Sequence, residues 1–373
     1  MEFIIPKDAL QKELAFVQSI VERKNMIPVL ANVLIESVGD DTIRINGTDL
    51  DLTIRVDAQV ESMPTQGAIC VQARKLFEIV RLLPNGPVTF TKEENEWVTV
   101  KCDKSTFRLP GIARETFPDL PSLQATPFSI GAGLLSTLIE KTIFAITTEE
   151  GRYTLSGAKF EVTKDSTKVI TTDGHRLALI EAKNGIRSAA DEPLDVLIPK
   201  KTLAELQKLA TGFDGDVQLG VDENHVYFQI GTRALVSRLL SGQFPNYEMV
   251  LPKNNEYSAT FATSDLTKAL RRVALMADDR SHAVTLEVIK EQTTIAAQSP
   301  EEGEGFEVVA STLNGEDLRI GFNAQYVLDF LNIINSAQVL FTFKDGNCQT
   351  EFRPVTDETD LRFFTIIMPM RVD

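Results

Sequence analysis

The densest group of side chains that could do chemistry is the run TTDGHRL, which spans Thr171 to Leu177. Asp173 and His175 stand on either side of Gly174, and such a pair could act as a general acid and base. The run places no nucleophile or second carboxylate with them. A glycine followed by polar residues at the start of a strand is also typical of a hydrogen-bonded turn with an exposed histidine, and this structural interpretation is favoured.

Other catalytic and metal-binding signatures are missing from the sequence. It has no P-loop, no GxGxxG motif after a strand, no HExxH and no GxSxG. Its three histidines and three cysteines are scattered and show no metal-ligand or CxxC spacing. The sequence therefore predicts no metal, no cofactor and no disulfide framework.

A repeat of 124 to 127 residues organises the chain. The dipeptides Thr-Asp and Phe-Pro each recur at one of these two offsets. Longer similar stretches start 127 and 124 residues apart: VQARKLFEIVRLL from Val71, IPKKTLAELQKLA from Ile198 and FNAQYVLDFLNII from Phe322. This periodicity predicts three tandem domains, at residues 1–122, 126–252 and 253–373.

Hydrophobic periodicity predicts an α+β fold in which each domain consists of two β-α-β-β-β halves. In the first half, a strand from Glu2 to Ile5 precedes an amphipathic helix from Lys7 to Lys24 and a strand from Val29 to Val38. Strands that follow one another in threes without helical crossovers favour antiparallel sheets. Six principal helices are predicted, starting near Lys7, Arg74, Gly131, Pro199, Ser264 and Asn323.

Charge is segregated by type of element. The six predicted helices carry a net charge of +6 in a chain whose net charge is −15. If the helices share one surface, that surface could bind a polyanion that the rest of the protein repels. The alternative is that Lys and Arg are good helix formers that simply solvate exposed helix faces.

The end of the sequence is unusually apolar. Residues from Ile366 to Met370 read IIMPM, whereas most chains end in polar residues. Two methionines beside a turn suit an adaptable groove for hydrophobic peptides, and a final core strand explains the isoleucines equally well.

Over its whole length the chain resembles one family, the bacterial replicative sliding clamp, which is the beta subunit of DNA polymerase III. The most specific matches are TTDGHRL at 171–177, GQFPNYEMVLPK at 242–253, IGFNAQYVLDFLN at 320–332 and MPMR at 368–371. The resemblance implies three clamp-fold domains per chain, with antiparallel sheets outside and helices lining a head-to-tail homodimeric ring around duplex DNA. It favours the polyanion interpretation of the basic helices.

The resemblance also implies site residues. Peptides of the polymerase III alpha subunit, the clamp loader and other peptide-motif proteins should bind between the second and third domains, at Leu155, Thr172, Gly174, His175, Arg176, Leu177, Pro245, Val250, Met368, Pro369, Met370 and Arg371. DNA should be contacted by Lys24, Arg152 and Tyr153. At the dimer interface, Phe107 and Leu109 should meet Leu275 and Met276. The chain departs from the family pattern at Glu149, Gln349 and the terminal Val372 and Asp373.

The resulting prediction is a non-catalytic accessory subunit that holds a polymerase on double-stranded DNA without sequence specificity. No apolar run reaches the ~18 residues that span a bilayer, and no leader is recognised at Met1, so we expect a cytoplasmic protein without a membrane partner. The alternative is a hydrolase that uses Asp173 and His175. A ring requires a dimer and has no turnover, whereas the hydrolase requires neither a ring nor a partner peptide.

Overall fold

The structure is a computed structural model that describes the chain except for residues 22–26, 122–127, 150, 184, 189–192 and 372–373. The chain packs into two compact units. Unit 1 comprises Met1–Leu135, Ser188–Ala190 and Lys201–Leu239, and unit 2 comprises Ser136–Arg187, Asp191–Lys200 and Leu240–Asp373. Each unit is built on one large β-sheet.

A 14-stranded sheet forms unit 1, and all of its strands except the two-residue β14 lie wholly within that unit. Its strand order is β14 (Arg187–Ser188), β10 (Phe128–Gly131), β16 (Asp216–Val221), β17 (His225–Ile230), β18 (Arg233–Arg238), β4 (Leu52–Gln59), β3 (Thr42–Thr48), β2 (Asn32–Val38), β6 (Ala68–Gln72), β9 (Ser105–Ile112), β8 (Trp97–Cys102), β7 (Pro87–Lys92), β1 (Glu2–Pro6) and β5 (Ser62–Thr65).

A 12-stranded sheet forms unit 2. Its order is β15 (Leu194–Pro199), β11 (Gly157–Val162), β12 (Ser166–Thr172), β13 (Arg176–Lys183), β26 (Leu361–Ile367), β25 (Thr350–Pro354), β24 (Gln338–Phe343), β19 (Tyr257–Ala262), β22 (Gly303–Asn314), β21 (Gln292–Ser299), β20 (Ala283–Val288) and β23 (Leu318–Asn323). Strand β13 pairs with β26 in the register that places Leu177 opposite Ile366. The last strand of the chain is therefore held beside the strand that follows the TTDGHRL turn.

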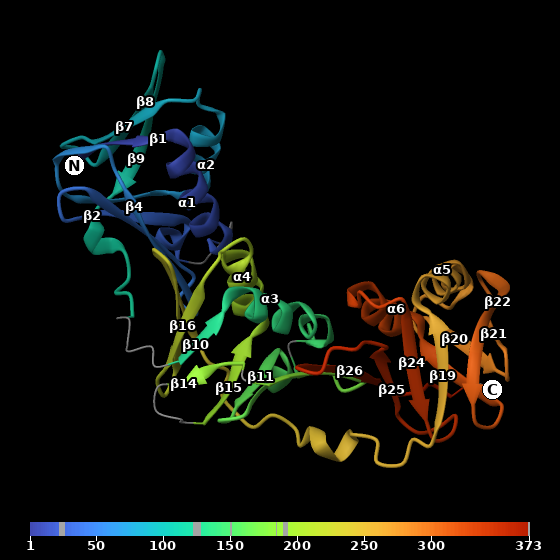
Figure 1. Ribbon diagram of the computed structural model, residues 1–373. Coiled ribbons are helices and arrows are strands. Elements are labelled where there is room, and N and C mark those ends of the chain that lie inside the picture. Colours follow the sequence, from blue (N-terminus) through green and yellow to red (C-terminus); the bar gives the residue numbers. More distant parts are fainter. Residues whose placement is uncertain (22–26, 122–127, 150, 184, 189–192, 372–373) are drawn as a thin grey trace. The chain divides into compact units, whose positions relative to one another are not determined.

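Six α-helices occur in the described residues: α1 (Lys7–Ile20), α2 (Ala73–Leu82), α3 (Ala132–Glu140), α4 (Lys200–Ala210), α5 (Thr263–Val273) and α6 (Ala324–Ile333). In unit 1, α1 and α2 pack side by side, and in unit 2, α5 and α6 do the same (Figure 1). In α1, Leu10, Leu14 and Val17 are buried at helical spacing, whereas Lys12 on the other face is exposed. This amphipathic pattern anchors the helix on the sheet and leaves its charges in solvent.

The sequence predicted the class of the fold well. The six expected helix starts each lie within one residue of the observed ones, and every strand pair in the described part of the chain is antiparallel. One strand was predicted too long, because Pro28 begins a 3-10 turn, Pro28–Ala31, and β2 starts only at Asn32. Proline fixes φ near the helical value and has no amide to give to a sheet.

The three cysteines are free thiols that differ in burial. Cys70 and Cys102 are buried free thiols, and Cys348 is half-buried and free. Burial raises the pKa of Cys70 to about 11, so this thiol stays protonated at neutral pH. Among the described helices, none is both long and apolar enough to cross a membrane.

Candidate functional site

The turn between β12 and β13 in unit 2 is held together by its own polar groups. The Thr172 hydroxyl donates to the carbonyl oxygen of Arg176 at 2.6 Å and accepts from the amide of Gly174 at 3.1 Å. Oδ1 of Asp173 accepts from the amides of His175 and Arg176 at 2.9 and 3.0 Å. Gly174 has φ of +90°, a backbone conformation that glycine adopts without steric cost. These bonds make the turn a rigid platform.

Arg176 connects this turn to the rest of unit 2. Its side chain is only 9% exposed, and its guanidinium pairs with Asp173 at 3.0 Å and with Asp329 of α6 at 2.6 Å. A third contact is the bond that it donates to the carbonyl oxygen of Phe144 at 2.7 Å. The guanidinium also lies 4.4 Å from the ring centre of Tyr326, a cation–π distance. Arg176 thus acts as a charged pin between β13, α6 and the turn at residues 143–145.

An apolar floor lies beneath the turn. Leu155 and Leu177 belong to one buried cluster with Ile170, Leu179, Leu197, Phe244, Tyr247, Phe364 and Ile366. The segment that follows Phe244 crosses this cluster and leaves Pro245 and Val250 exposed. Tyr247 donates to Glu161 at 2.7 Å, and burial together with this bond raises the pKa of Tyr247 above its usual value. The sequence-predicted residues Leu155, Leu177, Pro245 and Val250 are therefore neighbours in one surface region.

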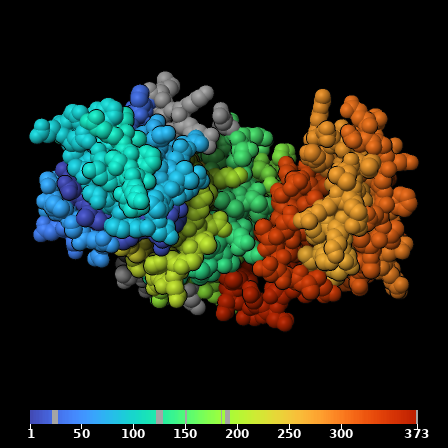
Figure 2. Space-filling view, turned by 90° about the horizontal axis from the view of Figure 1, so that it is seen from above, coloured from blue at the N-terminus to red at the C-terminus, as the bar shows by residue number. Residues whose placement is uncertain are grey.

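The end of the chain completes this region. After β26, the amide of Met368 donates to the carbonyl oxygen of His175 at 3.0 Å, and the amide of Met370 donates to Gly321 at 2.8 Å. Met368 and Arg371 are exposed, and Pro369 and Met370 are half-buried. Figure 2 shows residues of the last part of the chain, in red, at the surface of unit 2. The two isoleucines are buried residues of β26, as the core-strand interpretation expected, whereas the peptide-groove interpretation of the residues after them stays a prediction.

The arrangement is better suited to binding than to proton transfer. Both carboxylate oxygens of Asp173 are used within the turn, one by the two amides and the other by Nε of Arg176. His175 is exposed, and its ring stacks on Tyr326 at a centroid distance of 6.4 Å. Burial and, next, the nearby Asp173 carboxylate raise the pKa of Tyr326. The polar groups of the TTDGHRL motif therefore hold the turn in shape.

The residues expected to contact DNA occupy different settings. Lys24 lies outside the described residues. Arg152 donates to the carbonyl oxygen of Asp173 at 2.6 Å and pairs with Glu149 at 3.1 Å, so its guanidinium braces the turn. Tyr153 is exposed beside it. The acidic Glu149, which departs from the family pattern, is thus the ion-pair partner of Arg152.

Basic side chains concentrate on three of the six helices. Helices α2, α4 and α5 each carry three Lys or Arg residues and one acid, whereas α1 is balanced and α3 and α6 each carry a single acid. Lys75 and Arg81 of α2 and Lys268 of α5 are exposed and have no ion-pair partner in the described part of the chain. Sequence counting detected the excess positive charge but could not show which helices hold free cations.

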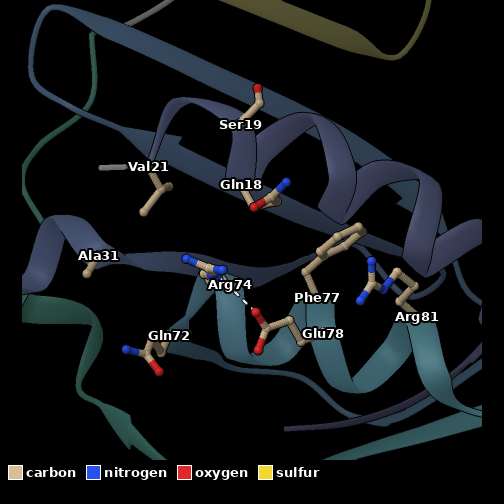
Figure 3. A pocket seen from close by; sticks show the side chains of 9 residues that line it. All are labelled: Gln18, Ser19, Val21, Ala31, Gln72, Arg74, Phe77, Glu78 and Arg81. Carbon is tan, nitrogen blue, oxygen red and sulfur yellow. Dashed lines mark hydrogen bonds and ion pairs between the residues drawn. The ribbon is translucent and has the colours of Figure 1, made fainter. Parts of the chain in front are cut away.

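A pocket of about 600 Å³ lies between α1 and α2 in unit 1. Figure 3 shows that Gln72, Arg74, Phe77 and Arg81 come from the α2 side, with Gln18 of α1 facing them. Arg74 pairs with Glu78 at 2.9 Å, whereas Arg81 has no ion-pair partner among the described residues and could bind an anion. The site would accept a phosphate group from solvent.

The four residues expected at the dimer interface differ in exposure. Phe107 of β9 is exposed, and Leu275 is 70% exposed in the 3-10 helix Ala274–Met276. Leu109 is buried within unit 1, and Met276 packs partly against the core of unit 2.

Two further exposed apolar residues, Phe306 and Val308, lie on β22. The sequence GEGFEVVAS could have revealed them, because alternate residues of a strand face opposite sides and Phe306 and Val308 face away from the buried Val309.

Comparison with known proteins follows the same three-part division as the repeats. The family DNA polymerase III beta subunit matches with its N-terminal domain at residues 1–121, its central domain at 129–246 and its C-terminal domain at 248–371. Proteins named beta sliding clamp from Caulobacter vibrioides and Pseudomonas aeruginosa are 35% and 33% identical, and each alignment covers 100% of both chains.

A solved structure gives the same result. The crystal structure of a sliding clamp (DNA polymerase III subunit beta) from Pseudomonas aeruginosa bound to griselimycin has a TM-score of 0.93 at 33% identity, covering 100% of each chain. The fold is therefore the three-domain sliding clamp fold. The chain belongs to the DNA polymerase III beta subunit family, which confirms the family that the sequence motifs indicated.

Proposed function

We propose that this protein is a processivity clamp of DNA replication, a homodimeric ring that encircles duplex DNA, slides along it and tethers a polymerase. The observation that carries the proposal is that all three repeats match one family and that the whole chain superposes on a solved clamp with a TM-score of 0.93. As a tether it performs no bond chemistry, in agreement with the structural use of Asp173. Its place of action is the replicating DNA in the cytoplasm.

We assign its three domains to residues 1–122, 126–252 and 253–373. Strand pairing continues across both boundaries, because β18 of the central domain pairs with β4 of the first, and β13 pairs with β26 of the third. This pairing explains why two compact units arise from three repeats. Backbone hydrogen bonds across each boundary would keep consecutive domains in a fixed register during sliding.

Dimerisation is assigned to two strands that each have an open edge. Residues 105–110 of β9 pair with β8, but on the other side β9 pairs, among the described residues, only at Gly111 and Ile112, with β6. Residues 303–310 of β22 pair with β21, but the other side of β22 pairs, within the described part of the chain, only from Ser311 onward, with β19. An open edge presents unpaired amides and carbonyls and readily accepts a strand of another chain. Head-to-tail addition of β22 of one copy to β9 of the other would satisfy both edges.

Side chains on these edges are complementary. Phe107 on β9 and Phe306 on β22, the latter 72% exposed, supply apolar contacts. Lys104 and Arg108 lie on or beside β9, and Glu304 lies on β22, so the two edges carry opposite charges. Opposite charges favour the heterologous pairing over pairing of either edge with itself. The exposed Leu275 would contact the partner copy directly. The buried Leu109 would contribute only by holding β9 in the conformation that pairs.

The DNA-facing surface is assigned to the basic helices α2, α4 and α5. Lysines and arginines that neutralise phosphates bind without reading bases, so the ring can slide. Lys75 and Arg81 of α2 and Lys268 of α5 are exposed and have no ion-pair partner among the described residues. The resemblance adds Tyr153 and Lys24, and Arg152 would contribute through the loop that it braces.

Partner peptides are assigned to the surface around the TTDGHRL turn. A hydrophobic side chain of the peptide would contact Leu155, Leu177 and Val250, and the methionines of the tail would adapt to different partners. Backbone groups of the turn and of Met368 to Arg371 would set the register of an extended segment. The polymerase III alpha subunit and the clamp loader are the expected ligands.

Light scattering tests the ring proposal. The wild-type protein should have twice the chain mass of 41.3 kDa. Phe306→Glu should yield monomers, because it places a charge at the centre of the proposed strand pair. Ile289→Glu is the matched control, since Ile289 is exposed on the same unit but lies outside β22. A monomeric wild type, or a Phe306→Glu protein that stays dimeric, would contradict the proposal.

A further inference from the structure

The β12–β13 turn has a counterpart between β3 and β4 of unit 1. There, the Thr48 hydroxyl donates to the carbonyl oxygen of Leu52 at 3.1 Å and accepts from the amide of Leu50 at 3.0 Å. Oδ1 of Asp49 accepts from the amides of Asp51 and Leu52 at 3.0 and 2.7 Å. All four bonds repeat those of the unit 2 turn, 124 residues earlier in the chain.

The strand beside the turn is also repeated. The carbonyl oxygen of Asp51 accepts from the amide of Arg238 at 2.9 Å, as that of His175 accepts from Met368 at 3.0 Å. Arg238 ends β18, which pairs with β4 as β26 pairs with β13. The Phe-Pro segment at Phe117 corresponds in sequence to that at Phe244. Unit 1 therefore repeats the backbone framework that we assign to partner peptides in unit 2.

This framework encloses a pocket of about 340 Å³ that lies wholly within unit 1. Such a volume is at the lower end of those that hold small ligands or short peptide segments. Its walls include Leu50, Asp51, Asp119, His225 and Arg238. The pocket is therefore present as a cavity and does not depend on analogy alone.

Leu50 gives this pocket an apolar wall at an unexpected place. It occupies the position of Gly174 and has φ of +83°, a conformation that is strained for leucine. Its side chain is nevertheless 50% exposed. A strained backbone that presents a half-exposed leucine to a pocket is not explained by packing of the core, and such strain commonly marks binding sites.

The charges of the pocket differ from those of the unit 2 surface. Asp51 and Asp119 line it together with Arg238, which lies 3.8 Å from Asp51 in an exposed ion pair, so Asp119 is the carboxylate of the lining without an ion-pair partner in the described part of the chain. A third carboxylate, Asp222, lies 3.4 Å from His225 at the edge of the pocket. The position of Arg176 is taken by the buried Leu52, so no charged pin is present there. The excess of carboxylates favours a basic ligand.

We propose that this pocket is a second docking site, for an extended segment of a partner protein in which an aliphatic side chain lies next to Lys or Arg. The aliphatic side chain would pack on Leu50, and the basic one would pair with Asp51 or Asp119. The proposal rests on the proposed unit 2 peptide site only for the comparison of the two turns. A ring with both sites could hold two partners of different chemistry on one chain.

Fluorescence polarisation with a labelled octapeptide tests the proposal. The probe has the core Lys-Leu-Lys-Leu between Gly-Ser ends, and the matched control peptide has the core Glu-Leu-Glu-Leu. The full-length dimer should bind the basic probe and not the acidic one. Leu50→Asn should weaken binding of the probe at least about fivefold, because asparagine tolerates a positive φ but removes the apolar wall. Leu50→Met, which keeps an apolar side chain, should stay within about twofold of the wild type.

Two more variants separate this site from the one in unit 2. Asp51→Asn with Asp119→Asn should weaken the probe about fivefold and flatten its salt dependence. Met368→Lys should leave the probe unaffected and should weaken a peptide that carries a glutamine and hydrophobic anchors, which Leu50→Asn should not. Melting temperatures check that each variant is folded.

The outcomes decide between the two sites. Three results would overturn the second site. The probe does not bind the wild type up to about 1 mM, it binds Leu50→Asn as tightly as the wild type, or it binds Met368→Lys more weakly than the wild type. Failure of the glutamine peptide alone would count against the proposed unit 2 site and leave the second site standing.

Discussion

Replacing Arg176 with methionine should destabilise unit 2 by about 3 kcal/mol, the lower end of the range for breaking a buried ion pair. The side chain is 9% exposed, and its partners Asp173 and Asp329 are 14% and 24% exposed. Removal of the guanidinium leaves two carboxylates poorly solvated and the carbonyl oxygen of Phe144 without this donor. The lower end applies because Asp329 is 24% exposed and can still recruit water, and because methionine keeps an unbranched apolar stem in place of that of arginine.

Calorimetry and hydrogen exchange measure this loss. A loss of about 3 kcal/mol corresponds to a fall of about 6–12 °C in melting temperature for a unit of this size. Exchange of the β13 and β26 amides should accelerate together, because Arg176 begins the strand that pairs with β26. Arg353→Met is the matched control, since its side chain is half exposed and 3.8 Å from Glu351, and it should cost less than about 1 kcal/mol.

A double-mutant cycle isolates the pair itself. The cycle combines Arg176→Met with Asp329→Asn and should give a coupling energy of about 1–3 kcal/mol. If Arg176→Met costs no more than the Arg353→Met control, the guanidinium is not a structural pin and the reasoning about the turn is wrong.

Three further predictions follow from the described contacts. Gly174→Ala should cost about 1–3 kcal/mol and weaken partner peptides, because φ is +90° and the new Cβ would lie 2.6 Å from Nη1 of Arg152; thermal melting and peptide titration measure both effects. Arg81→Glu should lower the slope of log affinity for DNA against log salt by about 1, and an unchanged slope would remove α2 from the DNA surface. Although burial opposes it, hydrogen bonds from Tyr227 and two backbone amides lower the pKa of Asp222 to about 2, so its contribution to stability is present above pH ~4 and is lost as pH falls toward 2. With Asp222→Asn, the free energy of unfolding should fall less steeply between pH ~4 and 2, and the difference from the wild type should be less than about 1 kcal/mol because the carboxylate is near solvent.

The class of the fold could be predicted from the sequence because its signals are local and repeated. Helix starts follow from periodicity, and the tandem repeat follows from recurrent motifs such as Thr-Asp and Phe-Pro. The turn at Gly174 was also recognisable, because glycine before polar residues is a local signal. The function was predicted from the family resemblance. The charge pattern alone could not distinguish a polyanion-binding surface from solvated helix faces.

Features that depend on long-range packing could not be predicted. The resemblance assigned Leu109 and Met276 to the dimer interface, and the sequence did not show that tertiary packing buries the first and half-buries the second. Arg176 gave no sign that it would meet Asp329, which is 153 residues away. The open edges of β9 and β22 arise from which strands pair, and the pairing of strands that are distant in the sequence is not encoded in any single segment.

Retention on DNA of defined topology tests the central claim most directly. The protein is loaded by an ATP-driven clamp loader onto a nicked circular duplex, and half of the sample is then cut once with a restriction enzyme before gel filtration. A closed sliding ring should remain on the circle and leave the linear DNA, because its phosphate contacts alone are weak. Equal retention on circular and linear DNA would contradict the account, since it would mean that affinity and not topology holds the protein in place.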